Sequence, residues 1–175
     1  MTAVQQRLQQ GIRALFAFTQ TPDYALAERY LNVEQMALFR RMRRSEQLHS
    51  LNVLHDVLAQ SHETPLSLAV SALLHDVGKS CYPLAIWQKS IAVIIRKASP
   101  SLYTRWSKGN PESRWYRAFV VAEKHPFWSC ELVRLTGADD CTLWLIEHHA
   151  DTLEQWAEHD YAELLARLKE ADDSN

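Results

Sequence analysis

The sequence predicts an all-α protein, and three observations carry that prediction. Apolar residues recur at helical spacing along most of the chain, as they do from Val4 to Phe16. Only four glycines and six prolines interrupt the 175 residues. No internal repeat or low-complexity tract is present. We therefore expect a helical bundle rather than a sheet.

Length and composition suit a single domain over residues 1–175. An apolar content of 47% can form a sizeable core without disulfides. Three cysteines without a Cys-x-x-Cys spacing argue against both a disulfide framework and a structural zinc knuckle. The chain begins with a polar segment, and its longest aliphatic run, Ile91–Ile95, is too short to span a bilayer. We expect a cytoplasmic protein with no transmembrane segment.

Helix-start signals place the elements of the first half. Helices are expected within residues 1–44. Ser45 is expected to cap the next helix, whose apolar face holds Leu48, Leu51, Leu54 and Leu58. Thr64-Pro65 should open another helix that ends near Gly78, because proline favours the first turn and glycine the end.

The same signals place the helices of the second half. Pro126 should start a helix that stops at Gly137. Asp139 or Asp140 should cap the helix that leads to His148 and His149. A closing helix or helix pair that delivers Asp172 is predicted from the spacing of Leu153, Trp156, Ala157, Leu164, Leu165 and Leu168.

A histidine and an aspartate, His75 and Asp76, end the apolar run in Ala72-Leu-Leu-His-Asp-Val-Gly-Lys79. Imidazole and carboxylate are hard to bury, and a divalent cation suits both as ligands. An isolated His-Asp pair has a plainer explanation, a core histidine bonded to a helix-end carboxylate. Here, however, the pair belongs to an ordered set of candidate metal ligands: His49, His75, Asp76, His125, His148, His149 and Asp172.

This order resembles the HD superfamily of metal-dependent phosphohydrolases, especially its HDIG-type members. In that pattern His-Asp-Ile/Val-Gly-Lys follows an earlier His-Ser and precedes a His-Pro. The matching positions run from His49-Ser50 through His125-Pro126 to Ala171-Asp172. The resemblance implies a helical bundle of the HD-domain type, phosphohydrolase activity, and metal ligation by the ordered set.

The ligand set is large enough for one or two divalent ions. His49, His75, Asp76 and Asp172 suffice for one ion with open positions, so His125 and one of His148 and His149 are left for a second ion. Asp76 would bridge the two, with a shared water as the nucleophile. The metal is open among Mn, Fe, Zn, Ni, Co and Mg.

The neighbours His148 and His149 cannot both take the same ligand position, because adjacent helical residues point about 100° apart. The resemblance favours His149, which has the aliphatic Ile146 three residues before it, although Leu145 stands in the same relation to His148. The other histidine would support the site. His55, His62 and His159, outside every motif, are expected to be packing or surface residues.

Lys79 is the second expected catalytic residue beside Asp76. If the helical turn continues past His75, its ammonium can neutralise a phosphate oxygen. The plainer explanation is a lysine that stabilises a helix C-terminus.

Residues 80–117 form an insertion between the His-Asp pair and His125. From Lys79 to Arg117 there are eight Lys or Arg and one acid, a net charge of +7, whereas residues 118–175 carry −9. A solvated face is the simplest explanation. We expect instead a helical, basic lid beside the metals that receives an anionic substrate. A helix lying in a lipid interface is the weaker alternative.

These features predict a divalent-metal-dependent phosphohydrolase acting on a nucleotide or another small phosphate ester, without a stable nucleic-acid complex. A cyclic-dinucleotide Gly-Tyr-Pro motif is absent after His149. An HD-fold di-iron oxygenase shares the ligand order and remains an alternative. A non-catalytic HD-type binding module is a second alternative, disfavoured because every ligand position is filled. The oligomeric state stays open, a homo-oligomer included.

Overall fold

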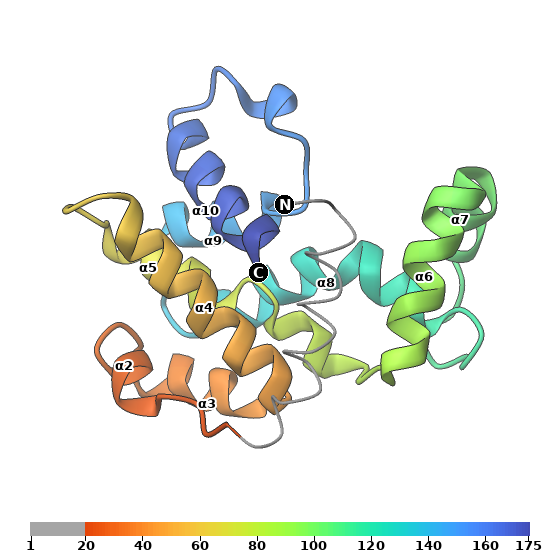
Figure 1. Cartoon of the computed structure of the whole chain (residues 1–175), viewed down its shortest axis with the longest axis horizontal. Coiled ribbons are helices and arrows are strands. Elements are labelled where there is room, and N and C mark those ends of the chain that lie inside the picture. Colours follow the sequence, from red (N-terminus) through yellow and green to blue (C-terminus); the bar gives the residue numbers. More distant parts are fainter. Residues whose placement is uncertain (1–19) are drawn as a thin grey trace.

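The computed structural model describes residues 20–175, which contain nine α-helices, two short 3-10 helices and no strand (Figure 1). The all-α prediction is confirmed for this range. The periodic stretch Val4–Phe16 lies outside the described residues. The helices of the bundle are α2 (Tyr24–Glu28), α3 (Val33–Arg41), α4 (Arg44–Gln60), α5 (Leu66–Leu74), α8 (Arg117–Arg134), α9 (Asp140–His148) and α10 (Ala162–Ser174).

Helix α5 lies at the centre of the bundle. Every residue from Leu68 to Leu74 is buried, as expected for a helix that is apolar on all sides. It packs against α4, α9, α10 and α3. The helix ends at Leu74 rather than near Gly78, and the chain continues into the 3-10 helix η1 (Val77–Cys81). His75 and Asp76 therefore lie at the turn between two helices, inside the bundle.

The predicted helix starts are correct in part. Asp139 caps α9 by accepting a hydrogen bond from the Thr142 backbone N–H at 2.7 Å, as predicted. The Ser45 prediction is wrong, because α4 already begins at Arg44. Glu46 stabilises the start of this helix instead, since its carboxylate accepts a hydrogen bond from the Arg43 backbone N–H at 3.3 Å.

Pro126 does not start a helix, contrary to the prediction, but lies inside α8. Proline has no N–H to donate, so the carbonyl of Ala122 loses its usual helical partner. The Nδ1 atom of His125 lies 3.1 Å from this carbonyl oxygen. The helix ends at Arg134, and Gly137 follows with a φ of 73°, a left-handed conformation that favours glycine.

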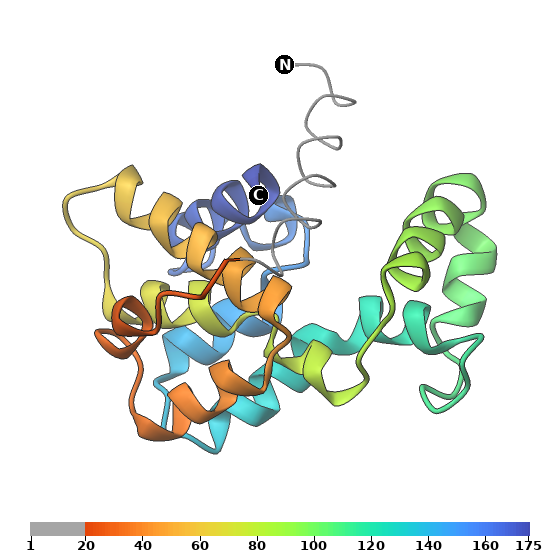
Figure 2. The ribbon, with the colours of Figure 1, turned by 60° about the horizontal axis from the view of Figure 1, so that its bottom comes forward.

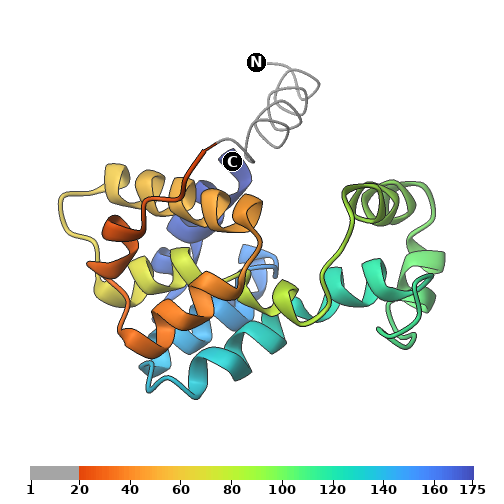
Figure 3. The ribbon, with the colours of Figure 1, turned by 90° about the horizontal axis from the view of Figure 1, so that it is seen from below.

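A smaller second hydrophobic cluster lies outside the bundle, on α6 (Ile86–Ala98), α7 (Pro100–Trp106) and the first half of α8. Its buried members are Leu84, Ala92, Tyr103, Ala118, Phe119 and Val121. Figures 2 and 3 show α6 and α7 projecting from the bundle as an arm. The insertion is thus helical, as expected, and it joins the bundle through η1 and α8.

The closing helix pair is also present, as η2 (Leu153–Trp156) and α10. Helix α10 returns to pack on α4 and α5, which carries Asp172 back to the centre of the bundle. None of the helices within residues 20–175 combines the length and apolarity needed to cross a membrane.

Candidate metal centre

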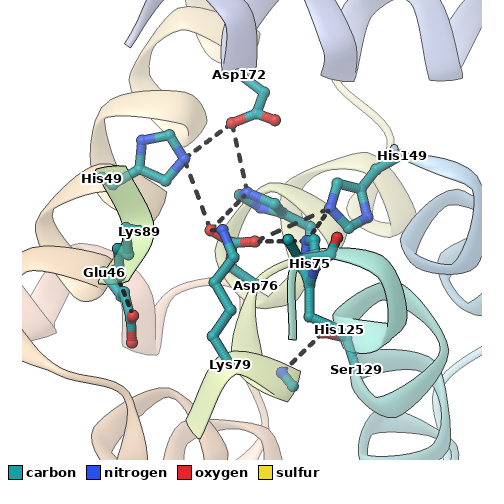
Figure 4. Close-up of polar contacts among 12 residues, drawn as sticks. Glu46, His49, His75, Asp76, Lys79, Lys89, His125, Ser129, His149 and Asp172 are labelled. Atoms are coloured by element: carbon teal, nitrogen blue, oxygen red, sulfur yellow. Dashed lines mark hydrogen bonds and ion pairs between the residues drawn. The ribbon is translucent and has the colours of Figure 1, made fainter. Parts of the chain in front are cut away.

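Six of the seven predicted ligands converge at one point in the bundle (Figure 4). They come from five parts of the chain that are distant in sequence. His49 lies on α4, His75 and Asp76 follow α5, His125 lies on α8, His149 caps the end of α9 and Asp172 lies on α10. His75, Asp76, His125 and His149 are buried, while His49 and Asp172 are partly exposed.

Asp76 lies between two sets of histidines, with one carboxylate oxygen facing each. Its Oδ2 is 3.6 Å from His75 Nε2 and 4.0 Å from His49 Nε2. Its Oδ1 is 3.3 Å from His125 Nε2 and 3.9 Å from His149 Nε2. The carboxylate therefore belongs to two groups of potential metal ligands.

Asp172 completes the first set. Its Oδ1 lies 2.8 Å from His49 Nε2 and 3.6 Å from His75 Nε2. The first set is therefore His49, His75, Asp76 and Asp172, and the second is Asp76, His125 and His149. These are the two groupings predicted from the sequence.

The backbone fixes the ring orientation of all three buried histidines. His75 Nδ1 lies 3.1 Å from Ala72 O, His125 Nδ1 lies 3.0 Å from Val121 O, and His149 Nδ1 lies 2.7 Å from Ile146 O. A carbonyl oxygen only accepts, so each Nδ1 carries the proton and donates it. In the neutral imidazole, the lone pair is then on Nε2 and points into the cluster. This tautomer is the one needed for metal ligation through Nε2.

One buried nitrogen of the cluster has no hydrogen-bond partner, and two others face each other. His75 Nε2 is buried and makes no hydrogen bond. His125 Nε2 and His149 Nε2 lie 3.2 Å apart, so in the Nδ1–H tautomers two lone pairs face each other. Buried polar atoms normally have partners, and a cation between these nitrogens would supply one. The donor set therefore fits divalent metal ions.

Burial and neighbouring charges set the protonation of the cluster. Burial would raise the pKa of Asp76, but Lys79 and His75 outweigh it and hold that pKa well below its ordinary value. Burial would likewise raise the pKa of Asp172, but the hydrogen bond from His49 and the nearby His75 ring outweigh burial and lower that pKa. Both carboxylates are therefore ionised and ready to ligate.

The buried histidines divide into two kinds. Burial lowers the pKa of His125 and of His149, so both rings are neutral. Burial also opposes protonation of His75, but the charge of Asp76 and the Asp172 carboxylate raise its pKa above the ordinary value. The second set is thus free of protons at its ligand atoms, whereas a metal at the first set competes with a proton on His75 over a wider pH range.

Gly78 allows η1 to approach α8 closely enough to position Asp76 against His125. A Cβ atom at this glycine would lie 2.4 Å from His125 O and 2.7 Å from Ser129 N. The Gly78 N–H donates to Ser129 Oγ at 2.8 Å, which ties the two elements together. The glycine of the His-Asp-Val-Gly-Lys motif is therefore required by packing.

Lys79 lies in the last turn of η1 and is ion-paired with Asp76. Its Nζ lies 2.6 Å from Asp76 Oδ2, the oxygen that faces the first ligand set. Burial would lower the pKa of Lys79, but Asp76 outweighs burial and raises that pKa, so the ammonium is charged. Lys79 supplies a positive charge at the edge of the cluster.

His148 lies apart from the cluster, so the candidate metal-ligand set contains only His149 of this pair. The Nδ1 of His148 bonds to Asp151 Oδ2 at 2.8 Å, and its ring packs on Trp144 and Trp156. As expected, His159 has a packing role, because it stacks on Trp144 with the ring planes 7° apart.

Glu46 was not predicted from the sequence to lie near the cluster, and Tyr103 was expected there only as part of the basic insertion. Glu46 is buried and accepts from Lys89 at 3.0 Å, which links the arm to α4. Tyr103 of α7 lines a cavity that also contains Lys79 and His125. No short motif surrounds either residue, so only tertiary structure could have identified them.

The chain matches no family model, no curated protein and no solved structure in the comparisons made. The proposed function therefore rests on the geometry of the described residues.

Proposed function

We propose that this protein is a divalent-metal-dependent phosphohydrolase with a bundle of the HD-domain type, acting on a small phosphate ester. The observation that carries the proposal is the position of Asp76, whose two oxygens face two separate sets of ligands. A carboxylate in this position can bridge two cations roughly 3.5–4 Å apart, a spacing common to two-metal phosphatases. The ordered ligand set, His49 to Asp172, supports the same reaction class.

In this proposal His49, His75, Asp76 and Asp172 hold one ion, and Asp76, His125 and His149 hold the other. Bound divalent ions supply a water of lowered pKa and neutralise charge on phosphoryl oxygens. The Nδ1 bonds to backbone carbonyls keep the histidine rings in ligand orientation. The buried setting strengthens every electrostatic contact at the site.

Lys79 contributes the positive charge that a phosphate ester needs. Its Nζ lies on Asp76, and its side chain lines the cavity beside His125. An ammonium in that place can neutralise a non-bridging phosphoryl oxygen. Asp76 and Lys79 are therefore the residues to which we assign direct roles in catalysis.

A metal inventory followed by a screen of phosphate esters tests the proposal. Protein purified with and without oxygen should carry divalent metal, and the metal-loaded protein should release inorganic phosphate. Asp76→Asn should lose both metal and activity, whereas His148→Ala, outside the cluster, should retain both. A coupled two-iron centre with oxygen-dependent turnover would favour the oxygenase alternative. Phosphate release that persists in Asp76→Asn would contradict the proposal.

A further inference from the structure

A cavity of about 250 Å³ opens directly beside the metal cluster, between the arm and α8. Lys79 and His125 belong to its wall, so a group bound there lies next to the proposed reaction centre. Most of the remaining wall is apolar and is made of Leu84, Ala92, Val93, Ala118, Val121 and Ala122. A larger apolar hollow of about 420 Å³, lined by Trp87, Ile91 and Trp115 among others, includes no residue of the cluster.

Three of the five polar side chains in the wall of the 250 Å³ cavity are cationic, namely Lys79, Lys89 and Arg96, whereas His125 and Tyr103 are neutral. Lys89 is paired with Glu46 at 3.0 Å, and Arg96 lies over the ring of Tyr103, 5.8 Å from its centroid. No acidic side chain lies among the described residues that form this wall. The cavity therefore accepts an anion at the metal end and an uncharged, apolar body along its length.

A nucleoside suits this wall poorly. Its base edges and ribose hydroxyls need hydrogen-bond donors and acceptors, but six of the eleven residues in this wall are apolar, and Lys79 and Lys89 are already paired with Asp76 and Glu46. Burying these polar groups against the apolar wall unpaired costs binding free energy. An alkyl group needs no polar partner and gains from leaving water. The chemistry of the wall thus separates two classes of phosphate ester that the sequence did not distinguish.

We propose that the substrate is the phosphate monoester of an apolar alcohol, with its alkyl group in this cavity and its phosphoryl group at the metal cluster. This inference rests on the proposed function and replaces the nucleotide with an aliphatic ester. Hydrolysis forms a bond from water oxygen to phosphorus and breaks the bond from phosphorus to the alcohol oxygen. The alcohol leaves with a proton from that water, and inorganic phosphate remains.

The volume sets the length of the alkyl group. A water-sized group takes about 30 Å³, so the cavity holds about eight such groups. A chain of about eight carbons should therefore fill it, and longer chains should gain little more. Chains shorter than this should leave part of the apolar wall in contact with water.

Alkylphosphonates of four to ten carbons test this inference by binding alone, because their P–C bond resists hydrolysis. Calorimetry on the metal-loaded full chain should show affinity rising about two- to fourfold per added methylene up to about eight carbons. Beyond that length the affinity should level off. Adenosine and uridine monophosphates should bind no more tightly than butylphosphonate. Affinity independent of chain length, or a preference for the nucleotides, would overturn the inference.

Two adjacent apolar residues of α6 provide a matched pair of variants. Val93 lines the cavity and Ile94 does not, while both are largely exposed and so tolerate a polar side chain. Val93→Asp should weaken octylphosphonate binding at least tenfold and flatten the dependence on chain length. Ile94→Asp should leave both unchanged. Equal loss in the two variants would also overturn the inference.

A parallel assay of phosphate release separates this inference from the proposed function. Affinity that rises with chain length while no ester is hydrolysed would contradict the phosphohydrolase activity and retain the alkyl site. Hydrolysis that is equally fast for butyl and octyl phosphate, with no gain in affinity, would retain the activity and remove the alkyl site.

Discussion

His125 and His149 face each other through their Nε2 atoms at 3.2 Å, although each ring already donates its Nδ1 proton to a backbone carbonyl. Two neutral rings held in this way bring their lone pairs together. A cation shared by the two nitrogens would replace this unfavourable contact with ligation, and the effects of added metal can therefore be tested.

Adding a suitable divalent metal should stabilise the folded chain. A ligand that binds the folded state at 100 times its Kd adds about 2.7 kcal/mol to the free energy of unfolding. Thermal unfolding with manganese, zinc or iron should therefore show a higher Tm than with chelator. His125→Ala should reduce the gain, and His148→Ala should not. A Tm unaffected by every metal would speak against the site.

Removing the bridging carboxylate should affect both ions. Asp76→Ala should abolish metal binding and hydrolysis together, because the remaining histidines lose the charge that balances the ions. His49→Ala and Asp172→Ala should each deplete one ion, and His125→Ala should weaken the other. Elemental analysis of the purified variants measures this directly. Equal loss in His49→Ala, Asp172→Ala and His125→Ala would indicate one shared ion instead.

The metal affinities of the two ligand sets should depend differently on pH. The raised pKa of His75 means that metal must displace a proton there, whereas burial keeps His125 and His149 neutral. His125→Ala, which keeps the first set, should lose manganese affinity by about tenfold per unit as pH falls below the His75 pKa. His49→Ala, which keeps the second set, should change less. The opposite order would mean that the protonation states are reversed.

Replacing Gly78 should disturb both the packing and the metal site. Gly78→Ala places a methyl group against the backbone of α8 and should lower the free energy of unfolding by about 1–3 kcal/mol. Metal content should fall with it, because Asp76 moves away from His125. Gly109→Ala is the control for packing, since its methyl group would clash with Tyr116 in the arm, so this variant should lose stability but keep its metal content. Gly78→Ala with unchanged stability and metal content would refute this role.

Substitutions of Arg96 and of Lys97 should have different effects on the KM for anionic esters. Both are exposed at the end of α6, but only Arg96 lines the cavity. Arg96→Gln should raise the KM for anionic esters several-fold and make it less sensitive to salt, with metal content unchanged. Lys97→Gln should behave as wild type. Initial-rate measurements at two ionic strengths compare the two variants. Identical effects of Arg96→Gln and Lys97→Gln would contradict a role for Arg96 in substrate binding.

The residues that converge in the candidate metal centre could be predicted well from the sequence, because ligand type and order are local properties. His49, His75, Asp76, His125 and Asp172 were each recognisable from their neighbours in the chain. The choice between His148 and His149 needed the structure, because both lie at the end of one helix and only its packing decides which ring points inward.

Tertiary packing also determines the features that could not be predicted from the sequence. Pro126 predicts a helix start from sequence, yet α8 runs through it, and the carbonyl that it leaves without an N–H partner lies next to His125. The basic insertion was recognised, but its apolar cavity beside His125 arises from α6, α7 and α8 together. The periodicity of a single segment cannot predict a cavity wall that three helices build together.

Anomalous X-ray scattering from crystals of the manganese-loaded protein tests the central claim most directly. We predict two peaks, one among His49, His75, Asp76 and Asp172 and the other among Asp76, His125 and His149, with Asp76 in contact with both. A single peak, or peaks that do not contact Asp76, would contradict the two-metal account.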